Sequence, residues 1–393
     1  MGLILNDLKN ACELEHVCDY VNNRTTSSMN YISTENMLPN KGGISESTII
    51  PPGTTTEYKI GDILISNIRP YFQKIWCADR CGGCSADVLC IRAKENTDSK
   101  YLYYLLSQQA FFDYVMSGAK GCKMPRGDKK QIMQWPVNIP AIDVQKKVVA
   151  ILSSLDNKIR LNRRINDNLE EQAKALFKSW FVDFEPFKGG KFVDSELGLI
   201  PKGWSTGTIY SYIDVIYGAP YKSELFNDKK QGLPLIRIRD LKTYTPQYYT
   251  KEVLPNTEYV ECGDIIAGMD AEFIPHIWRG EKGVLNQRLC KFVPKYDYVS
   301  KYYIYSLVYP KLAFVQSYKV GTTVSHLGKA DIDRFKVIVP PEDIIMQYSK
   351  IVNSYFAEIV KVSNENQILS SLRDTLLPKL MSGELSVEEV SLD

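Results

Sequence analysis

The densest cluster of positive charge in the chain is the segment 120–130, which carries five cations, one carboxylate, two glycines and a proline. This composition predicts an exposed loop. Lysine side chains can hold phosphates, and an arginine can bind guanine through two parallel hydrogen bonds. A duplex DNA partner is therefore one interpretation, and a solvated basic loop without a partner is the other. The candidate residues are Lys120, Lys123, Arg126, Lys129 and Lys130.

A second candidate loop lies 200 residues further along the chain. Residues 121–140 can be aligned with residues 321–340 without a gap, and the segment 321–329 is short and polar, between apolar runs. Hydroxyl and imidazole groups can donate hydrogen bonds to phosphates or to base edges. Two loops at matched positions favour DNA contact for both. The candidates here are Thr322, Thr323, Ser325, His326 and Lys329.

Another matched pair of segments differs in charge. Residues 67–74 contribute Arg69, Tyr71 and Lys74, whereas the corresponding residues 269–273 contribute acidic side chains, including Glu272. A carboxylate can accept a hydrogen bond from cytosine in the major groove, although Glu272 could equally lie away from DNA. Different side chains on one scaffold are what two different half-sites would require.

Two weaker candidate groups lie in the second half of the chain. Tyr221 and Lys222 follow a Gly-Ala-Pro turn, and Arg237 and Arg239 alternate with apolar residues. That alternation predicts that both arginines project from one face of a strand over residues 235–238. The alternative for the many tyrosines in this region is packing within strands.

The cysteines and histidines do not form a clear catalytic or metal-binding pattern. Cys77, Cys81, Cys84 and Cys90 could in principle bind zinc, but they contain one Cys-x-x-Cys pair rather than two. We find neither a glycine-rich cofactor loop nor a phosphate loop, and the three histidines are widely separated. We therefore expect no cofactor, no metal and no catalytic site.

An internal duplication predicts the elements that must position these side chains. Gly61-Asp62-Ile63 recurs as Gly263-Asp264-Ile265, and Ser99-Lys100-Tyr101 recurs as Ser300-Lys301-Tyr302. A repeat of this size predicts a pseudo-two-fold molecule with two equivalent surfaces. Apolar runs predict strands at 63–65, 88–91, 235–238 and 336–339, and a helix is expected over 100–115.

Each repeat continues into a long helical pattern. From residue 144 to about residue 182 there is no proline or glycine, and apolar residues alternate in steps of four and three, as in a coiled-coil seam. A second seam begins near residue 343 and matches the first at a separation of 200, so we expect the two helices to pack antiparallel. Asn166 and Asn366 lie at equivalent seam positions and either set the register or face solvent. Pro378 should end or kink the second helix.

These patterns divide the chain into a mixed domain (1–140), a long helix (141–186), a connector with a second mixed domain (187–340) and a second long helix (341–393). The predicted fold class is α+β, with the two mixed α/β domains separated by two long antiparallel coiled-coil helices. The chain has 393 residues, 44% of them apolar, and a net charge of +2. No membrane span or export signal is apparent, and nine cysteines without an export signal favour reduced thiols in the cytoplasm.

Five segments carry a family resemblance: 145–152 (QKKVVAIL), 161–166 (LNRRIN), 176–184 (LFKSWFVDF), 200–204 (IPKGW) and 376–384 (LLPKLMSGE). Together with the repeated Gly-Asp-Ile and Ser-Lys-Tyr landmarks, they resemble the specificity subunits of type I restriction-modification enzymes. The resemblance implies a non-catalytic subunit in which each mixed domain recognises one half of a split, asymmetric site in double-stranded DNA. It also implies that the helices dock two methyltransferase subunits, and that motor-nuclease subunits join the complex.

A rival hypothesis is a coiled-coil scaffold whose two domains bind protein partners. It accounts for the helices and the tyrosines equally well, but it does not account for the paired polar loops.

Overall fold

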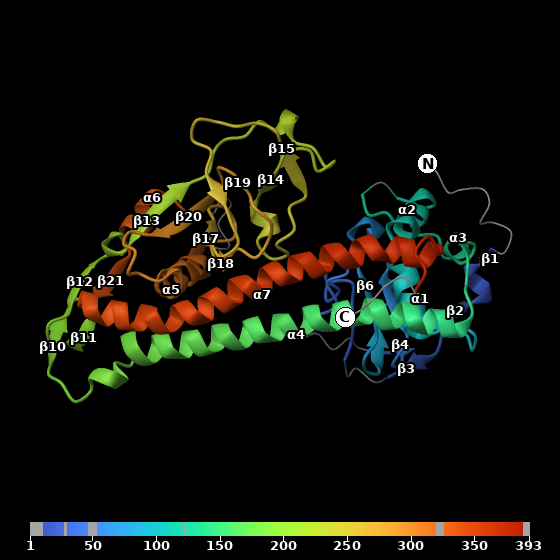
Figure 1. Cartoon of the computed structure of the whole chain (residues 1–393), viewed down its shortest axis with the longest axis horizontal. Helices are drawn as coiled ribbons and strands as arrows, with labels where there is room; N and C mark the ends of the chain where they lie inside the picture. The colour runs from blue at the N-terminus through green and yellow to red at the C-terminus, as the bar shows by residue number, and fades with distance from the viewer. Residues whose placement is uncertain (1–10, 27–29, 46–52, 122, 320–325, 388–393) are drawn as a thin grey trace. The chain divides into compact units, whose positions relative to one another are not determined.

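The computed structural model describes residues 11–26, 30–45, 53–121, 123–319 and 326–387. The chain forms two compact units, of which unit 1 comprises residues 1–157 and 371–393 and unit 2 comprises residues 158–370. Two long helices, α4 (Ile142–Phe181) and α7 (Glu342–Ser382), each contribute to both units (Figure 1). The predicted long helices are thus present.

The centre of unit 1 is an antiparallel four-stranded sheet with the strand order β2-β8-β5-β6. Its two inner strands are apolar and buried, which is why a short continuous run such as Ile63-Leu64-Ile65 forms a strand here. The predicted strands at 63–65 and 88–91 are confirmed. The bounds are β2 (Cys18–Tyr20), β8 (Val88–Ala93), β5 (Ile63–Ser66) and β6 (Ile75–Cys77).

Smaller elements complete unit 1. A three-stranded sheet has the order β3-β4-β7, and β1 pairs with β9. Short helices connect and cover the strands, and α1 packs against β6, β5 and β8. The bounds are β1 (Cys12–Glu13), β3 (Arg24–Thr25), β4 (Thr55–Tyr58), β7 (Gly82–Cys84), β9 (Pro136–Val137), η2 (Leu14–His16), η3 (Pro70–Phe72), α1 (Ser99–Leu106), α2 (Gln109–Ser117) and α3 (Lys129–Met133).

The expectation of one helix over residues 100–115 is wrong, because α1 ends at Leu106 and α2 begins at Gln109. The Ser107 hydroxyl donates to the Tyr103 carbonyl oxygen at 2.6 Å, and the Gln108 side chain donates to the Leu105 carbonyl. Side-chain hydrogen bonds of this kind compete with the backbone pattern of a helix. Apolar periodicity alone does not detect them.

Unit 2 repeats the central sheet of unit 1 with the order β13-β20-β17-β18. One helix, α5 (Lys301–Lys319), packs against β18 and β20 and continues through Pro310 (Figure 1). A second sheet has the order β15-β14-β19-β16, in which β14 and β19 are parallel. The bounds are β13 (Ile213–Tyr217), β20 (Leu289–Pro294), β17 (Ile265–Gly268), β18 (Pro275–Ile277), β15 (Tyr248–Thr250), β14 (Leu233–Ile236), β19 (Gly283–Leu285) and β16 (Tyr259–Val260).

Two further antiparallel strand pairs and several short helices complete unit 2. β10 pairs with β11, and β12 pairs with β21, which confirms the strand predicted at 336–339. The bounds are β10 (Phe192–Ser195), β11 (Gly198–Pro201), β12 (Ser205–Thr208), β21 (Lys336–Val339), α6 (Lys329–Asp333), η4 (Glu185–Phe187), η5 (Ile209–Ser211), η6 (Ser223–Leu225) and η7 (Ile238–Asp240).

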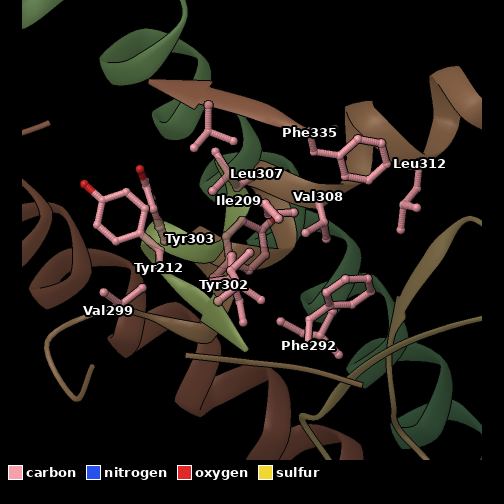
Figure 2. Close-up of a cluster of buried hydrophobic side chains, with 14 of the residues drawn as sticks. Ile209, Tyr212, Phe292, Val299, Tyr302, Tyr303, Leu307, Val308, Leu312 and Phe335 are labelled. Atoms are coloured by element: carbon pink, nitrogen blue, oxygen red, sulfur yellow. The ribbon is translucent and has the colours of Figure 1, made fainter. Parts of the chain in front are cut away.

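Much of the tyrosine content of unit 2 is core. Tyr212, Tyr302 and Tyr303 lie among aliphatic and aromatic side chains from α5, β20 and η5 (Figure 2), and each is at most 4% exposed. Burial raises the pKa of these phenols, since the charged phenolate would lose its hydration. For these residues, packing rather than partner binding explains the aromatic side chain.

The repeated Gly-Asp-Ile landmark has a structural explanation in both units. The Asp62 carboxylate accepts from the Lys59 backbone N–H at 2.7 Å and forms a two-bond ion pair with Arg92. The Asp264 carboxylate accepts from the Glu261 N–H at 3.0 Å and from the Lys301 ammonium at 2.6 Å. Each aspartate therefore closes the turn before an inner strand.

The two long helices pack antiparallel. In unit 2, the Asn162 amide donates to Glu365 at 2.7 Å and to Asn366 at 3.0 Å, while the Asn166 amide donates to Ser363 at 3.0 Å. Sequence numbers rise along one helix as they fall along the other. Every predicted seam residue of α4 and α7 is buried or half-buried.

A polar contact also joins the two helices within unit 1. Arg373 of α7 donates to Asp156 of α4 at 2.9 Å, and Asp156 accepts from the Tyr104 hydroxyl at 2.7 Å. Pro378, which was expected to end or kink the second helix near its last turn, lies inside α7, and the helix ends four residues later at Ser382. A proline this close to a helix end removes one backbone hydrogen bond and leaves the last turn in place.

Candidate nucleic-acid interface

Three segments of unit 1 meet at a place we call junction 1: the loop 67–69 after β5, the turn 86–87 before β8, and residues 120–121 and 123–127 of the basic segment. The Asn67 N–H donates to the Asp87 carbonyl at 2.9 Å, and the Arg69 N–H donates to the Pro125 carbonyl at 2.8 Å. Lys120 and Arg126 exchange two backbone hydrogen bonds of 3.0 Å, which closes the basic loop on itself. Two of the predicted DNA-contacting segments are thus brought together from distant parts of the chain.

The cations of junction 1 pair with acids on its surface. Arg126 lies 3.0 Å from Asp87, and its side chain is 55% exposed. Lys120 lies 2.9 Å from Asp128, and this contact together with backbone N–H donors lowers the pKa of the Asp128 carboxyl. Exposed ion pairs of this kind contribute little to stability, so a phosphate or a base could replace the acid at little cost.

The remaining cations of the basic loop are exposed. Lys123, Lys129 and Lys130 all lie on the surface, and the last two form the first turn of α3. The Lys129 ammonium is 5.9 Å from the centre of the Tyr20 ring. The predicted basic surface is therefore available to a charged partner.

The three candidates from the 67–74 segment differ in availability. Tyr71 is 50% exposed. Arg69 has a left-handed backbone (φ 50°), and among the described residues its buried Nε atom has no hydrogen-bond partner. Lys74 points elsewhere: its ammonium donates to the Thr34 carbonyl at 2.7 Å, and burial lowers its pKa. In this structure the Lys74 ammonium therefore makes an internal contact, and its role in DNA binding stays a prediction.

Unit 2 contains the matching junction 2, formed by the loop 269–271 after β17, the turn 287–288 before β20, and residues 326–328. The Met269 N–H donates to the Arg288 carbonyl at 2.8 Å, and the Leu327 N–H donates to the Met269 carbonyl at 2.7 Å. Asp270 forms a backbone bridge with His326, as Ile68 does with Arg126 in unit 1. Ala271 has the left-handed backbone (φ 59°) that Arg69 has in junction 1.

The side chains of junction 2 are arranged around acids. The Asp270 carboxylate lies 2.7 Å from the His326 imidazole through one oxygen and 3.2 Å from the Arg288 guanidinium through the other. Glu272 lies 3.1 Å from Lys242. Lys329 is exposed at the start of α6. The candidates Thr322, Thr323 and Ser325 fall outside the described residues.

The other candidates of unit 2 lie outside junction 2. Tyr221 is 5% exposed and its hydroxyl donates to Thr257 at 3.0 Å, so its side chain packs in the core of unit 2. Lys222 is exposed. The expected strand over 235–238 ends at Ile236, and η7 follows. Arg237 and Arg239 therefore do not share a strand face.

The two arginines have different surroundings. The Arg237 guanidinium lies 5.3 Å from the Tyr248 ring centre and 5.9 Å from that of Phe226, whereas Arg239 is exposed beside Gln247. A buried acid, Asp240, accepts from the Arg237 backbone N–H and so converts the expected strand into a helical turn. That hydrogen bond depends on a side chain three residues further along the chain, which the alternation of arginines and apolar residues does not reveal.

Two charged residues of the junctions were missed by the sequence analysis, namely Asp87 and Arg288. Both lie in a two-residue turn immediately before an inner strand, and they are 201 positions apart. An alignment extended through the strands 88–93 and 289–294 would have matched them. Nothing in either local sequence indicates that the turn meets a loop from another part of the chain.

The cysteines do not form a metal centre in the described part of the chain, where no group of three or more His, Cys, Asp or Glu residues has suitable geometry. The Cys90 thiol donates to Asp62, and burial raises the pKa of the Cys77 thiol to about 11. No described helix has the length and apolar character needed to cross a membrane.

Comparisons with known proteins point to one family. The family described as "Type I restriction modification DNA specificity domain" matches this chain twice, over residues 10–171 and 201–370. The specificity subunit of the type I restriction enzyme MjaIX from Methanocaldococcus jannaschii is 28% identical over 76% of this chain and 71% of its own length. The HindI specificity subunit from Haemophilus influenzae is 24% identical over 90% of this chain and 94% of its own length.

A crystal structure of a type I restriction-modification S subunit from M. genitalium covers 97% of this chain and 98% of its own, with 15% identity and a TM-score of 0.46. The two family matches cover both junctions and the larger part of each unit. The chain therefore belongs to the type I restriction-modification DNA specificity family.

Proposed function

We propose that this chain is the subunit that selects the DNA sequence for a type I restriction-modification enzyme. Junction 1 contacts one half of a split, asymmetric duplex site, and junction 2 contacts the other half. The chain itself performs no chemistry. Two methyltransferase subunits dock on it to modify the site, and motor-nuclease subunits join them for restriction.

The observation that carries this proposal is the equivalence of the two junctions. Each holds a loop after one inner strand against the turn before the next and against a third segment, and the backbone hydrogen bonds correspond. The exposed side chains differ, with Arg126 and lysines in one junction and Asp270, Arg288 and His326 in the other. A duplicated scaffold with different side chains suits two different half-sites.

The low net charge of the chain supports a contribution of other subunits to DNA binding. A net charge of +2 provides little general attraction to DNA, so we expect weak binding by this chain alone. The methyltransferase subunits would supply further phosphate contacts in the complex. Because bound phosphates release counterions, binding should weaken as salt increases.

Exposed apolar side chains on the long helices support partner docking. Leu161 of α4 is 52% exposed, and Ile368 of α7 is 68% exposed. Ile368 lines a groove of about 730 Å³ together with Phe356 and Val360. Apolar surface of this kind on a helix is typical of a protein interface.

The test is to co-express the chain with the methyltransferase encoded beside it and to sequence the methylated positions of the host DNA. We expect a bipartite methylated motif that is absent from the host without this chain. A stable complex without a motif would favour the scaffold hypothesis, and gel-shift competition without any sequence preference would support that outcome. Failure to form a complex would contradict the docking part of the proposal.

A further inference from the structure

Two turns of the molecule make corresponding backbone hydrogen bonds but carry side chains of opposite charge. In junction 1, the Asp87 N–H donates to the Ser85 hydroxyl at 3.2 Å, and the Asp87 carbonyl accepts from Asn67. In junction 2, the Arg288 N–H donates to the Asn286 side-chain oxygen at 3.2 Å, and the Arg288 carbonyl accepts from Met269. Asp87 and Arg288 therefore occupy the same position in the two repeats.

This correspondence places the exposed arginine on different segments in the two units. In junction 1, the turn before β8 carries the acid, Asp87, and the basic segment carries the cation, Arg126. In junction 2, the turn before β20 carries the cation, Arg288, and the loop 269–271 carries the acid, Asp270. The loop position that matches Arg126 holds His326, which contacts the same Asp270.

Arg288 is well placed to contact a base edge. Its side chain is 67% exposed, and Asp270 engages it through the Nη1 atom at 3.2 Å. Among the described residues, neither Nε nor Nη2 of Arg288 has a hydrogen-bond partner. An arginine offers two parallel N–H groups in a rigid fork, which matches the O6 and N7 acceptors of guanine.

The backbone of Arg288 is held on both sides, which limits the conformational freedom lost on binding. Asn286, which accepts from the Arg288 N–H, is 7% exposed, and the strand β20 begins at the next residue. A side chain on such a supported position binds with less loss of entropy than one on a free loop.

Asp270 itself is a poor candidate for base contact. Its side chain is 29% exposed, and its two carboxylate oxygens contact His326 and Arg288 respectively. A carboxylate could accept a hydrogen bond from cytosine only after losing one of these partners. Its geometry suits a positioning residue that orients the arginine.

We propose that Arg288 is the principal base-specifying residue of unit 2, that it recognises a guanine edge in the second half-site, and that Asp270 positions it. This inference rests on the proposed function, because it requires that junction 2 faces DNA. It identifies Arg288 as the residue of junction 2 that contacts the DNA bases, and guanine as the base that it contacts.

The test uses the complete methyltransferase complex, in which DNA methylation is measured on a library randomised across both half-sites. Arg288→Ala should reduce discrimination at one guanine position of one half-site by roughly 5- to 150-fold and leave the other half-site unchanged. Arg288→Lys keeps the charge but loses the fork, so it should also lose discrimination. Asp270→Asn should weaken discrimination at the same position by less.

The control is Lys229→Ala, an exposed lysine of unit 2 outside junction 2, which should leave the motif unchanged. Full discrimination in Arg288→Lys, or an equal loss of methylation on all sequences in Arg288→Ala, would show a phosphate contact and overturn the inference. A normal motif in both variants would overturn it too. If the wild-type complex methylates no bipartite motif, the proposed function itself has failed. Thermal unfolding of each variant separates a loss of recognition from a loss of folding.

Discussion

Junction 1 and junction 2 show how one backbone arrangement can present two different charge patterns. Both join three segments through corresponding backbone hydrogen bonds, and both have a left-handed residue at the same place, Arg69 or Ala271. The exposed cation lies on the loop in one junction and on the turn in the other. Because main-chain contacts hold the scaffold, the side chains can differ without disturbing it.

The two aspartates of the repeated Gly-Asp-Ile motif also differ in the groups that they contact. Asp62 is 1% exposed and binds Arg92 through two nitrogens, whereas Asp264 is 8% exposed and contacts two lysines, Lys291 and Lys301. Lys291 also contacts Glu258 and the Tyr259 carbonyl, so it keeps partners if Asp264 is removed. The aspartate of this motif thus forms a single ion pair in unit 1 and belongs to a network of charged side chains in unit 2.

The largest predicted effect is a difference in stability between variants of these two aspartates. Asp62→Ala should lower the free energy of unfolding by about 3 kcal/mol, because it leaves the Arg92 guanidinium and the Lys59 N–H without their acceptor. Asp264→Ala should cost less, about 2 kcal/mol, since the network retains other contacts. Urea unfolding of the full chain measures both, with the exposed Asp79→Ala as the control. An equal loss of unfolding free energy in both variants would show that Asp62 and Asp264 contribute equally to stability.

The next effect tests the independence of the two junctions. Arg126→Ala should relax recognition at one position of one half-site, by about 1–3 kcal/mol of discrimination, and leave the other half-site intact. Methylome sequencing of the co-expressed complex measures this. A uniform loss of methylation over all sequences would instead identify Arg126 as a phosphate contact. A change in both half-sites would contradict the assignment of one half-site to each unit.

A smaller effect concerns the polar layer between the long helices in unit 2. Among the described residues, the buried Oδ1 atoms of Asn162 and Asn166 have no hydrogen-bond partner. Asn166→Leu should therefore raise the free energy of unfolding by about 1 kcal/mol, since Ser363 keeps its bond to the Ile359 carbonyl. Thermal unfolding measures the change.

If Asn166 also fixes the register of the helix pair, the same variant should recognise half-sites at more than one spacing. Unchanged spacing would separate the two roles and leave Asn166 without a register function. A matched substitution at the exposed Asn168 should change neither quantity.

The smallest effect is a pH dependence at Asp240, which caps the turn after β14 in unit 2; the matching turn of unit 1 is capped by the uncharged Asn36. Burial raises the pKa of Asp240 from its ordinary value of 3.8 to about 6. The folded state therefore binds the proton more tightly, and stability should fall as pH rises from about 4 to about 6.

Asp240→Asn removes this slope and can still accept from the Arg237 N–H. Melting temperatures of both proteins between pH 4 and 7 should diverge in favour of the variant as pH increases. Parallel curves would show that Asp240 does not titrate in this range.

Local patterns predicted a large part of this architecture. The seam residues of α4 and α7 recur at helical spacing over some 40 residues, and the strand 63–66 is a short, continuous apolar run. Such signals depend on residues close together in the chain. The predictions failed where a side chain intervened locally: Ser107 interrupts a helix, and Asp240 ends a strand in a helical turn.

The amino-acid sequence by itself determined the duplication, the two long helices and the basic segment 120–130, because each is written in residues that are neighbours in the chain or that recur at one fixed interval. Only the tertiary structure decided which of the candidate side chains remain accessible. It directs Lys74 to a backbone carbonyl, buries Tyr221, and places Arg288 beside Asp270 and His326. Those outcomes depend on contacts between segments 18 to 56 residues apart, for which a single sequence contains no local signal.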